Sequence, residues 1–151
     1  MTRKEKAMTL FEAGYNCSQA VVLAFADLTG VDSKTLAKLA SSFGGGMGRL
    51  REVCGAVTGM FMVLGLLYGY SEAEAGAEKA GHYALIQQAA AKFSEINGSI
   101  VCRELLGLSN KTDSPTPDKR TAEYYKKRPC RELVGIAAEI VEEIINKNSA
   151  A

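Results

Sequence analysis

The chain lacks several features on which common functions depend. It has no tryptophan, one histidine (His82), and a formal net charge of only +1 over 151 residues. This charge balance gives no basis for binding nucleic acid or an anionic membrane surface. A single histidine on an alanine-rich stretch is more typical of a surface or packing position, and it supports no Ser-His-Asp catalytic set.

Long apolar runs are also missing. The longest, residues 53–68, covers about 16 residues and includes three glycines, whereas a transmembrane helix needs about 20. Residues 1–6 are largely charged, so we expect no export signal or transit peptide. The sequence therefore predicts a cytoplasmic protein without membrane insertion. In that reducing compartment, an even number of cysteines favours metal binding or catalysis over a disulfide framework.

Alternation of apolar and polar residues with period two is absent, while apolar spacings of three and four recur throughout. This pattern predicts an all-α fold without a sheet, a helical bundle of about six to seven helices. A chain of this length can bury a core as one domain, residues 1–151, without help from disulfides or metal.

Capping residues and glycines place the expected helices along the chain. The helices are residues 3–13 after the Thr2 cap, 16–28, 33–43, an apolar helix ending near Tyr68, 71–97 with a Ser71–Glu74 capping box, 99–107, a short polar helix beginning near Pro117, and 129–146. Residues 148–151 are expected to fray.

The segment Gly44-Gly45-Gly46-Met47-Gly48 interrupts the helical pattern. Glycine loses much backbone freedom on ordering, so we expect a loop with a purpose or a mobile hinge. Its amides could bind an anion or cluster sulfurs, although the Gly-Lys-Ser/Thr ending of a P-loop is missing. Gly55 and Gly59 share one helix face, which indicates close helix packing or, alternatively, close approach to a bound group. The glycines assigned to cofactor binding are Gly44, Gly45, Gly46, Gly48, Gly55 and Gly59.

Four cysteines carry the clearest functional signal: Cys17, Cys54, Cys102 and Cys130. Two of them begin near-copies of one hexapeptide, CRELLG at 102–107 and CRELVG at 130–135. No two form a Cys-x-x-Cys pair, so only the fold can assemble a shared site, and a zinc knuckle is disfavoured. The opposing interpretation is that each thiol is a small buried hydrophobic group.

All four cysteines lie at or near the start of an expected helix. Cys17, Cys102 and Cys130 fall in the first turn of an expected helix, and Cys54 lies near the start of the apolar one. Backbone amides and the helix dipole there favour a thiolate, which is both the nucleophile and the metal ligand. Nearby cations would add to this effect: Arg51, Arg103, Arg128 and Arg131.

These residues resemble the C-GCAxxG-C-C family, small proteins regarded as redox-active because of four cysteines and a Cys-Gly-Ala-x-x-Gly element. The matching segments are Asn16-Cys17-Ser18-Gln19-Ala20, Gly44 to Gly48, Cys54-Gly55-Ala56-Val57-Thr58-Gly59, Cys102-Arg103-Glu104-Leu105 and Cys130. The resemblance implies a redox function without naming the reaction. Some relatives are joined to electron-transfer modules, which suits an iron–sulfur site.

We therefore expect the four cysteines to meet at one end of the bundle as catalytic residues or metal ligands. An iron–sulfur cluster is preferred over thiol–disulfide exchange, because four thiolates suit cluster ligation and exchange proteins more often carry a close pair. In the exchange case, Cys54 is the expected nucleophile. A structural metal site with four cysteine ligands and inert packed thiols are the alternatives. A redox partner protein is expected, while enzymatic turnover and a homo-oligomer stay open.

Overall fold

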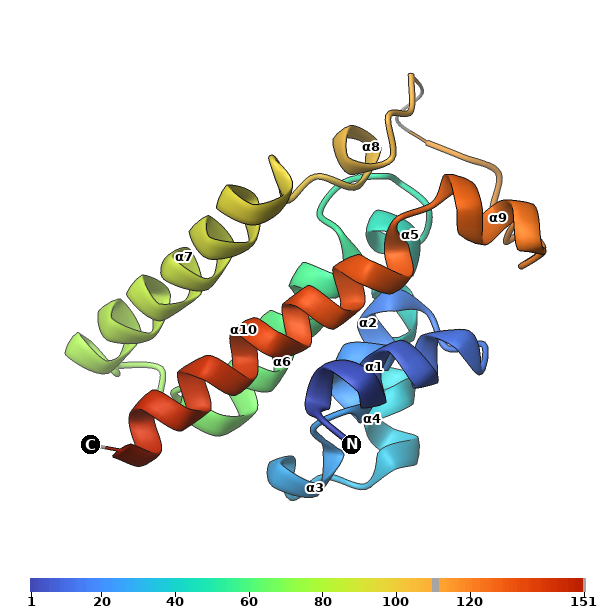
Figure 1. The fold of residues 1–151 in the computed structure, drawn as a ribbon. Coiled ribbons are helices and arrows are strands. Elements are labelled where there is room, and N and C mark those ends of the chain that lie inside the picture. Colours follow the sequence, from blue (N-terminus) through green and yellow to red (C-terminus); the bar gives the residue numbers. More distant parts are fainter. Residues whose placement is uncertain (110–111, 151) are drawn as a thin grey trace.

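Helices dominate the computed structural model, which describes residues 1–109 and 112–150 (Figure 1). Within those residues the only β pairing is an isolated antiparallel bridge between Val53 and Val101. The all-α prediction is confirmed. In chain order the helices are α1 (Arg3–Glu12), α2 (Cys17–Leu23), α3 (Ala26–Thr29), α4 (Ser33–Ala40), the 3-10 turn η1 (Ser41–Phe43), α5 (Gly44–Met47), α6 (Gly55–Tyr68), α7 (Ala77–Asn97), α8 (Cys102–Leu105), α9 (Ala122–Lys127) and α10 (Cys130–Ala150).

Helix α6 is the apolar centre of the bundle. It packs against α2 and α10, and α10 packs in turn against α1. Gly59 permits the contact with α2, because a Cβ at this position would lie 2.8 Å from the carbonyl oxygen of Ser18. Phe11, Phe25 and Phe93 are almost completely buried in the same continuous core. No helix in the described residues is both long and apolar enough to cross a bilayer.

Two predicted helix starts carry the expected capping boxes. The Thr2 side chain accepts from the amide of Glu5, and the Glu5 carboxylate accepts from the amide of Thr2. Asn16 and Gln19 form the same reciprocal pair. The second box matters for the site, since it fixes Cys17 as the first residue of α2.

Other boundaries differ from the predictions. The long helix starts at Ala77 instead of Ser71, because Gly76 precedes it with φ 56° and ψ −110°, a conformation that no helix continues through. The predicted helix over 16–28 divides into α2 and α3, separated by a break at Phe25. These divisions make the helices more numerous than expected.

The C-terminal third also departs from the prediction. The polar helix begins at Ala122 after a Thr121 cap, and Pro117 lies in the irregular segment before it. Asp118 in that segment pairs with arginines instead of starting a helix. Helix α10 continues to Ala150, so the fraying expected from residue 148 is not seen up to that point, and residue 151 lies outside the described residues.

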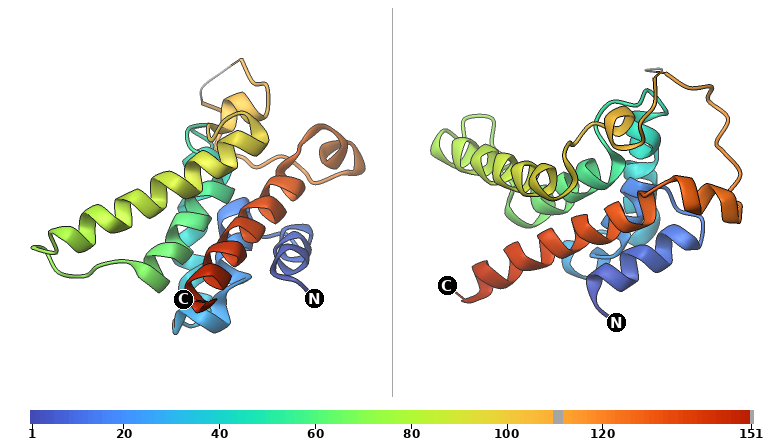
Figure 2. Two further views of the ribbon diagram at one scale, coloured as in Figure 1. Left: turned by 60° about the vertical axis from the view of Figure 1, so that its left-hand side comes forward. Right: turned by 45° about the horizontal axis from the view of Figure 1, so that its top comes forward.

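The short helices gather at one end of the molecule. Figures 1 and 2 show α5, α8 and α9 close to the beginning of α10, at the end opposite the two termini. Each of α2, α8 and α10 starts with a cysteine. The topology therefore brings helix starts from distant parts of the chain to one region.

Candidate functional site

All four cysteines line one cavity of about 420 Å³ at this end. Cys17, Cys102 and Cys130 are the first residues of α2, α8 and α10, and Cys54 is the N-cap of α6. Cys17 is partly exposed and the other three are buried, and all four are free thiols. The structure thus brings together the four residues that the sequence singled out.

The glycine segment forms a left-handed turn beside the cysteines. Positive φ angles of 58–69° occur at Gly45, Gly46, Met47, Gly48, Arg49 and Arg51. A residue with a Cβ pays about 1–2 kcal/mol for this conformation, so surrounding contacts must hold the three non-glycine residues there. The turn is closed by hydrogen bonds from the Gly48 amide to the Gly44 carbonyl and from the Glu52 amide to the Gly46 carbonyl, both 3.0 Å.

Both the φ angle and the limited space require a glycine at position 46. A Cβ at Gly46 would lie 2.6 Å from the Cβ of Cys102 and 2.8 Å from the Cα of Arg51. Gly55 allows a similar approach on the opposite wall, where its Cβ would lie 3.0 Å from that of Cys17. The backbone at these two glycines therefore lies in close contact with Cys102 and Cys17.

The predicted glycine set divides between two uses. The members that line the cavity are Gly44, Gly45, Gly46, Gly48 and Gly55. Gly59 instead lies in the contact between α2 and α6, as the packing interpretation expected.

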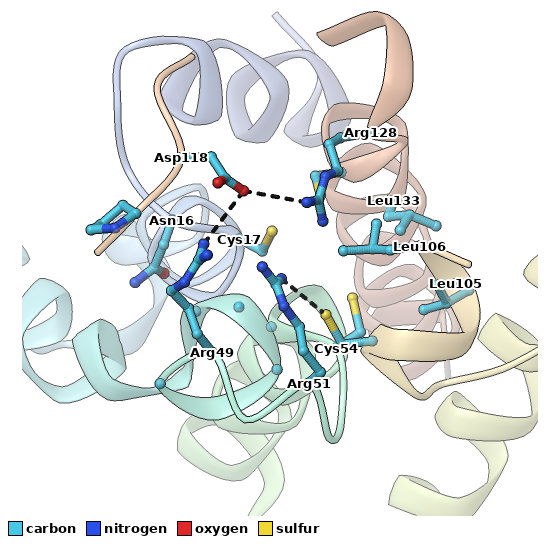
Figure 3. Close-up of a pocket in the computed structure, with 18 of the residues that line it drawn as sticks. Asn16, Cys17, Arg49, Arg51, Cys54, Leu105, Leu106, Asp118, Arg128 and Leu133 are labelled. Atoms are coloured by element: carbon cyan, nitrogen blue, oxygen red, sulfur yellow. Dashed lines mark hydrogen bonds and ion pairs between the residues drawn. The ribbon is translucent and has the colours of Figure 1, made fainter. Parts of the chain in front are cut away.

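Arginines and aspartates form the cavity's polar wall. The lining arginines are Arg49, Arg51, Arg120 and Arg128. Figure 3 shows Asp118 between two of them, and its Oδ2 accepts from Arg49 Nη1 at 3.5 Å and from Arg128 Nη2 at 3.3 Å. Asp113 accepts from Arg51 Nε at 2.8 Å. Cations outnumber carboxylates in this wall.

The prediction that arginines next to the cysteines in sequence would lie near the thiols was only partly right. Arg103 and Arg131, each next to a cysteine, turn away from the cavity to pair with Glu52 and Glu12. Long-range folding instead supplies residues that the sequence did not single out for the site: Arg49, Asp113, Asp118, Arg120 and Tyr124. The ion pairs of Arg49 with Asp118 and of Arg51 with Asp113 join segments that are far apart in the chain.

Burial raises the pKa of most of the thiols. It raises the pKa of Cys54 to about 12. It also raises the pKa of Cys102, where hydrogen bonding to Arg51 offsets part of the effect. Cys17 has a pKa well above its ordinary value, because it donates a hydrogen bond to Cys130 and is desolvated. At these three positions, desolvation and thiol contact outweigh the lowering expected at a helix start.

Cys130 is the exception among the four. Its contact with the Cys17 thiol lowers the pKa of Cys130 to about 7, despite an opposing effect of burial. The charge of Arg128 and a hydrogen bond from Tyr124 act in the same direction. In the metal-free protein, Cys130 is therefore the thiol that ionises most readily.

The donor groups do not converge on a single point. In the parts of the chain that the structure describes, no three His, Cys, Asp or Glu side chains are placed to hold one metal ion. The described side chains therefore do not form a preassembled site for one metal ion. His82 takes no part in the cavity, and its ring packs edge-on against Tyr70 with the centroids 6.1 Å apart.

A comparison with protein families identifies the family to which the chain belongs. Residues 15–144 match the family described as "Putative redox-active protein (C_GCAxxG_C_C)". The chain belongs to this family. The region matched to the C_GCAxxG_C_C family contains all four cysteines, the left-handed turn and the four lining arginines. No curated protein and no solved structure matches the chain.

Proposed function

We propose that this protein transfers electrons through an iron–sulfur cluster held by Cys17, Cys54, Cys102 and Cys130. The observation that carries the proposal is that four free thiols from distant segments line one cavity. Four cysteine thiolates are the usual ligands of such clusters. Ligands of a cluster surround a volume, whereas ligands of one ion surround a point.

The charge of the cavity wall supports an anionic occupant. Four arginines line the cavity, and two aspartates, Asp113 and Asp118, pair with three of them. The fourth, Arg120, donates to the backbone carbonyl oxygens of Phe11 and Tyr15. A cluster bound by four thiolates is an anion, and a cationic excess in a poorly solvated wall stabilises it.

The residues around the cysteines suit this role. When bound, the cluster would supply one-electron redox chemistry. The chain would provide the thiolate ligands, a close-approaching backbone at Gly46 and Gly55, and hydrogen bonding to sulfur from Arg51. Hydrogen bonds and burial around ligand sulfurs are the levers by which proteins set such potentials.

Anaerobic purification tests the proposal. We expect coloured protein with stoichiometric iron and acid-labile sulfide, and we expect replacement of any one cysteine by serine to lower both. Wild-type protein treated with a chelator is the control for the spectrum. Colourless protein with four titratable thiols, still free of iron after reconstitution with iron and sulfide, would contradict the proposal.

A second candidate function is thiol–disulfide exchange, and the contact between Cys17 and Cys130 favours it. The two thiols would give two electrons and two protons to a disulfide substrate and form a Cys17–Cys130 disulfide. Cys130 replaces Cys54 as the nucleophile in this case, because burial raises the pKa of Cys54 whereas the pKa of Cys130 is lowered to about 7. Exchange activity that needs Cys17 and Cys130 but survives Cys54→Ser and Cys102→Ser would establish this function.

A separate redox partner protein and a cytoplasmic location complete the proposal. All four cysteines are free thiols, the state that a reducing cytosol maintains. A site that only exchanges electrons needs a donor and an acceptor, and we expect a separate protein to supply them.

A further inference from the structure

Arg51 is the one charged residue that is buried in the described parts of the chain, with 4% of its surface exposed. Its Nη1 donates to the sulfur of Cys102 at 3.6 Å, and its Nε donates to Asp113 at 2.8 Å. A buried cation is stable only where partners compensate its lost hydration. The thiol of Cys102 is therefore one of two side chains that hold this charge inside the protein.

The backbone fixes Arg51 beside Cys102. Arg51 has φ 58°, a left-handed conformation unfavourable for a residue with a Cβ. Two backbone hydrogen bonds join the segments, from the Cys102 amide to the Glu52 carbonyl and from the Arg103 amide to the Arg51 carbonyl. Figure 3 shows the Arg51 side chain pointing from the turn into the cavity. The left-handed turn directs the Arg51 guanidinium toward the Cys102 sulfur, and the backbone hydrogen bonds hold the two segments in this arrangement.

Asp113 links this pair to the outside of the molecule. Its side chain is 31% exposed, and it also lies 3.8 Å from Arg49. Its negative charge offsets part of the positive charge that Arg51 presents to Cys102. The electrostatic effect of Arg51 on the Cys102 sulfur therefore depends on the charge of Asp113, which is more exposed.

We propose that Arg51 is a positioning residue that raises the reduction potential of the site through the Cys102 sulfur, and that Asp113 moderates this effect. The inference rests on the proposed redox function. Reduction adds negative charge, which a neighbouring cation stabilises, so the cation makes reduction easier. Removing Asp113 leaves the cation less compensated and makes reduction easier still.

Redox titration of the iron-loaded protein tests this directly. Arg51→Met should shift the potential to a more negative value, and Asp113→Asn should shift it to a more positive one. Arg131→Met is the matched control, because Arg131 follows Cys130 as Arg103 follows Cys102, and its side chain pairs with Glu12. We expect no shift for Arg131→Met. A wild-type potential in Arg51→Met, or shifts of the same sign in Arg51→Met and Asp113→Asn, would overturn the inference.

Metal-free, reduced protein provides a second readout, which does not depend on cluster binding. Losing a hydrogen bond from a charged donor should leave about tenfold less Cys102 thiolate at a given pH. Alkylation of Cys102, followed by peptide mass spectrometry, should slow about tenfold in Arg51→Met and stay unchanged in Arg131→Met. Equal Cys102 rates in wild type and Arg51→Met would reject the role of Arg51. Absence of iron from the wild type would instead reject the proposed function and leave this result to decide on Arg51.

Discussion

The two near-identical hexapeptides adopt different structures. Residues 102–107 contain the four-residue helix α8 (Cys102–Leu105), and Gly107 beyond its end has a left-handed conformation with φ 65°. Residues 130–135 open the 21-residue helix α10, in which Gly135 is buried against Met8 of α1. Both copies nevertheless place their cysteine at a helix start on the cavity wall. The shared sequence specifies where the thiol lies, and tertiary contacts decide how far the helix continues.

The neighbours of each copy explain the difference. The first copy is paired through its backbone with residues 51–52, next to the left-handed turn. The second copy is packed along α1, and helix α10 continues across α6. A helix gains most of its stability from such packing instead of from local propensity. Changes in the turn should therefore affect the Cys102 side of the cavity more than the Cys130 side.

The largest effect is expected from Gly46→Ala. The added Cβ would meet the Cys102 Cβ at 2.6 Å and the Arg51 Cα at 2.8 Å, at a φ of 68°. Conformational strain and overpacking together should lower the free energy of unfolding by about 3 kcal/mol. Denaturant unfolding of the metal-free protein measures this. Gly48→Ala, with φ 62° and no atom nearer than 3.9 Å, should cost only about 1 kcal/mol. Equal losses would show that the close approach to Cys102 is unimportant.

Thiol reactivity should separate the two copies next. Because the pKa of Cys130 is lowered to about 7, its thiolate fraction should rise about tenfold between pH 6 and pH 8 and then level off. Burial raises the pKa of Cys102, so its alkylation should still be increasing beyond pH 9. Pulsed alkylation of reduced, metal-free protein, followed by peptide mass spectrometry, measures the pH profile of each thiol. Parallel pH profiles for the two thiols would contradict the assigned environments.

The two equivalent glycines should respond differently to alanine. Gly107→Ala places a Cβ in open space but at φ 65°, and it should cost about 1 kcal/mol. Gly135→Ala improves helix propensity, while the flexible Met8 side chain must move away from a 2.8 Å contact. These opposing terms should leave stability within about 0.5 kcal/mol of wild type. A larger loss at Gly135 than at Gly107 would reverse the comparison.

The second residues of the two copies should also contribute little to stability. Arg103 pairs with Glu52 and Arg131 with Glu12, and all four side chains are between 29% and 47% exposed. Surface ion pairs contribute little, so Arg103→Ala and Arg131→Ala should each change stability by less than about 1 kcal/mol. Urea midpoints at low and high salt would reveal any larger coupling. A loss well above this value would mean that one pair supports the cavity wall.

Local signals in the sequence predicted much of the site. The Asn16 cap, the glycine segment and the positions of the cysteines near helix starts all depend on neighbours within a few residues. The cavity wall was harder to predict from the sequence, because its ion pairs join distant segments. Arg51 and Asp113 are 62 residues apart, and no periodicity or cap links them. The contact with Cys130 at Cys17, and burial at Cys54 and Cys102, also outweighed the helix-start effect on the thiol pKa, and both follow only from the assembled fold.

Native mass spectrometry of the anaerobically purified protein tests the central claim most directly. The account predicts a mass above that of the polypeptide by whole numbers of iron and sulfide, and this increment should disappear when acid releases the cluster. Cys54→Ser should bind less iron than wild type. A wild-type mass equal to the reduced polypeptide, or lighter by two hydrogens through a disulfide, would contradict cluster binding at the four cysteines.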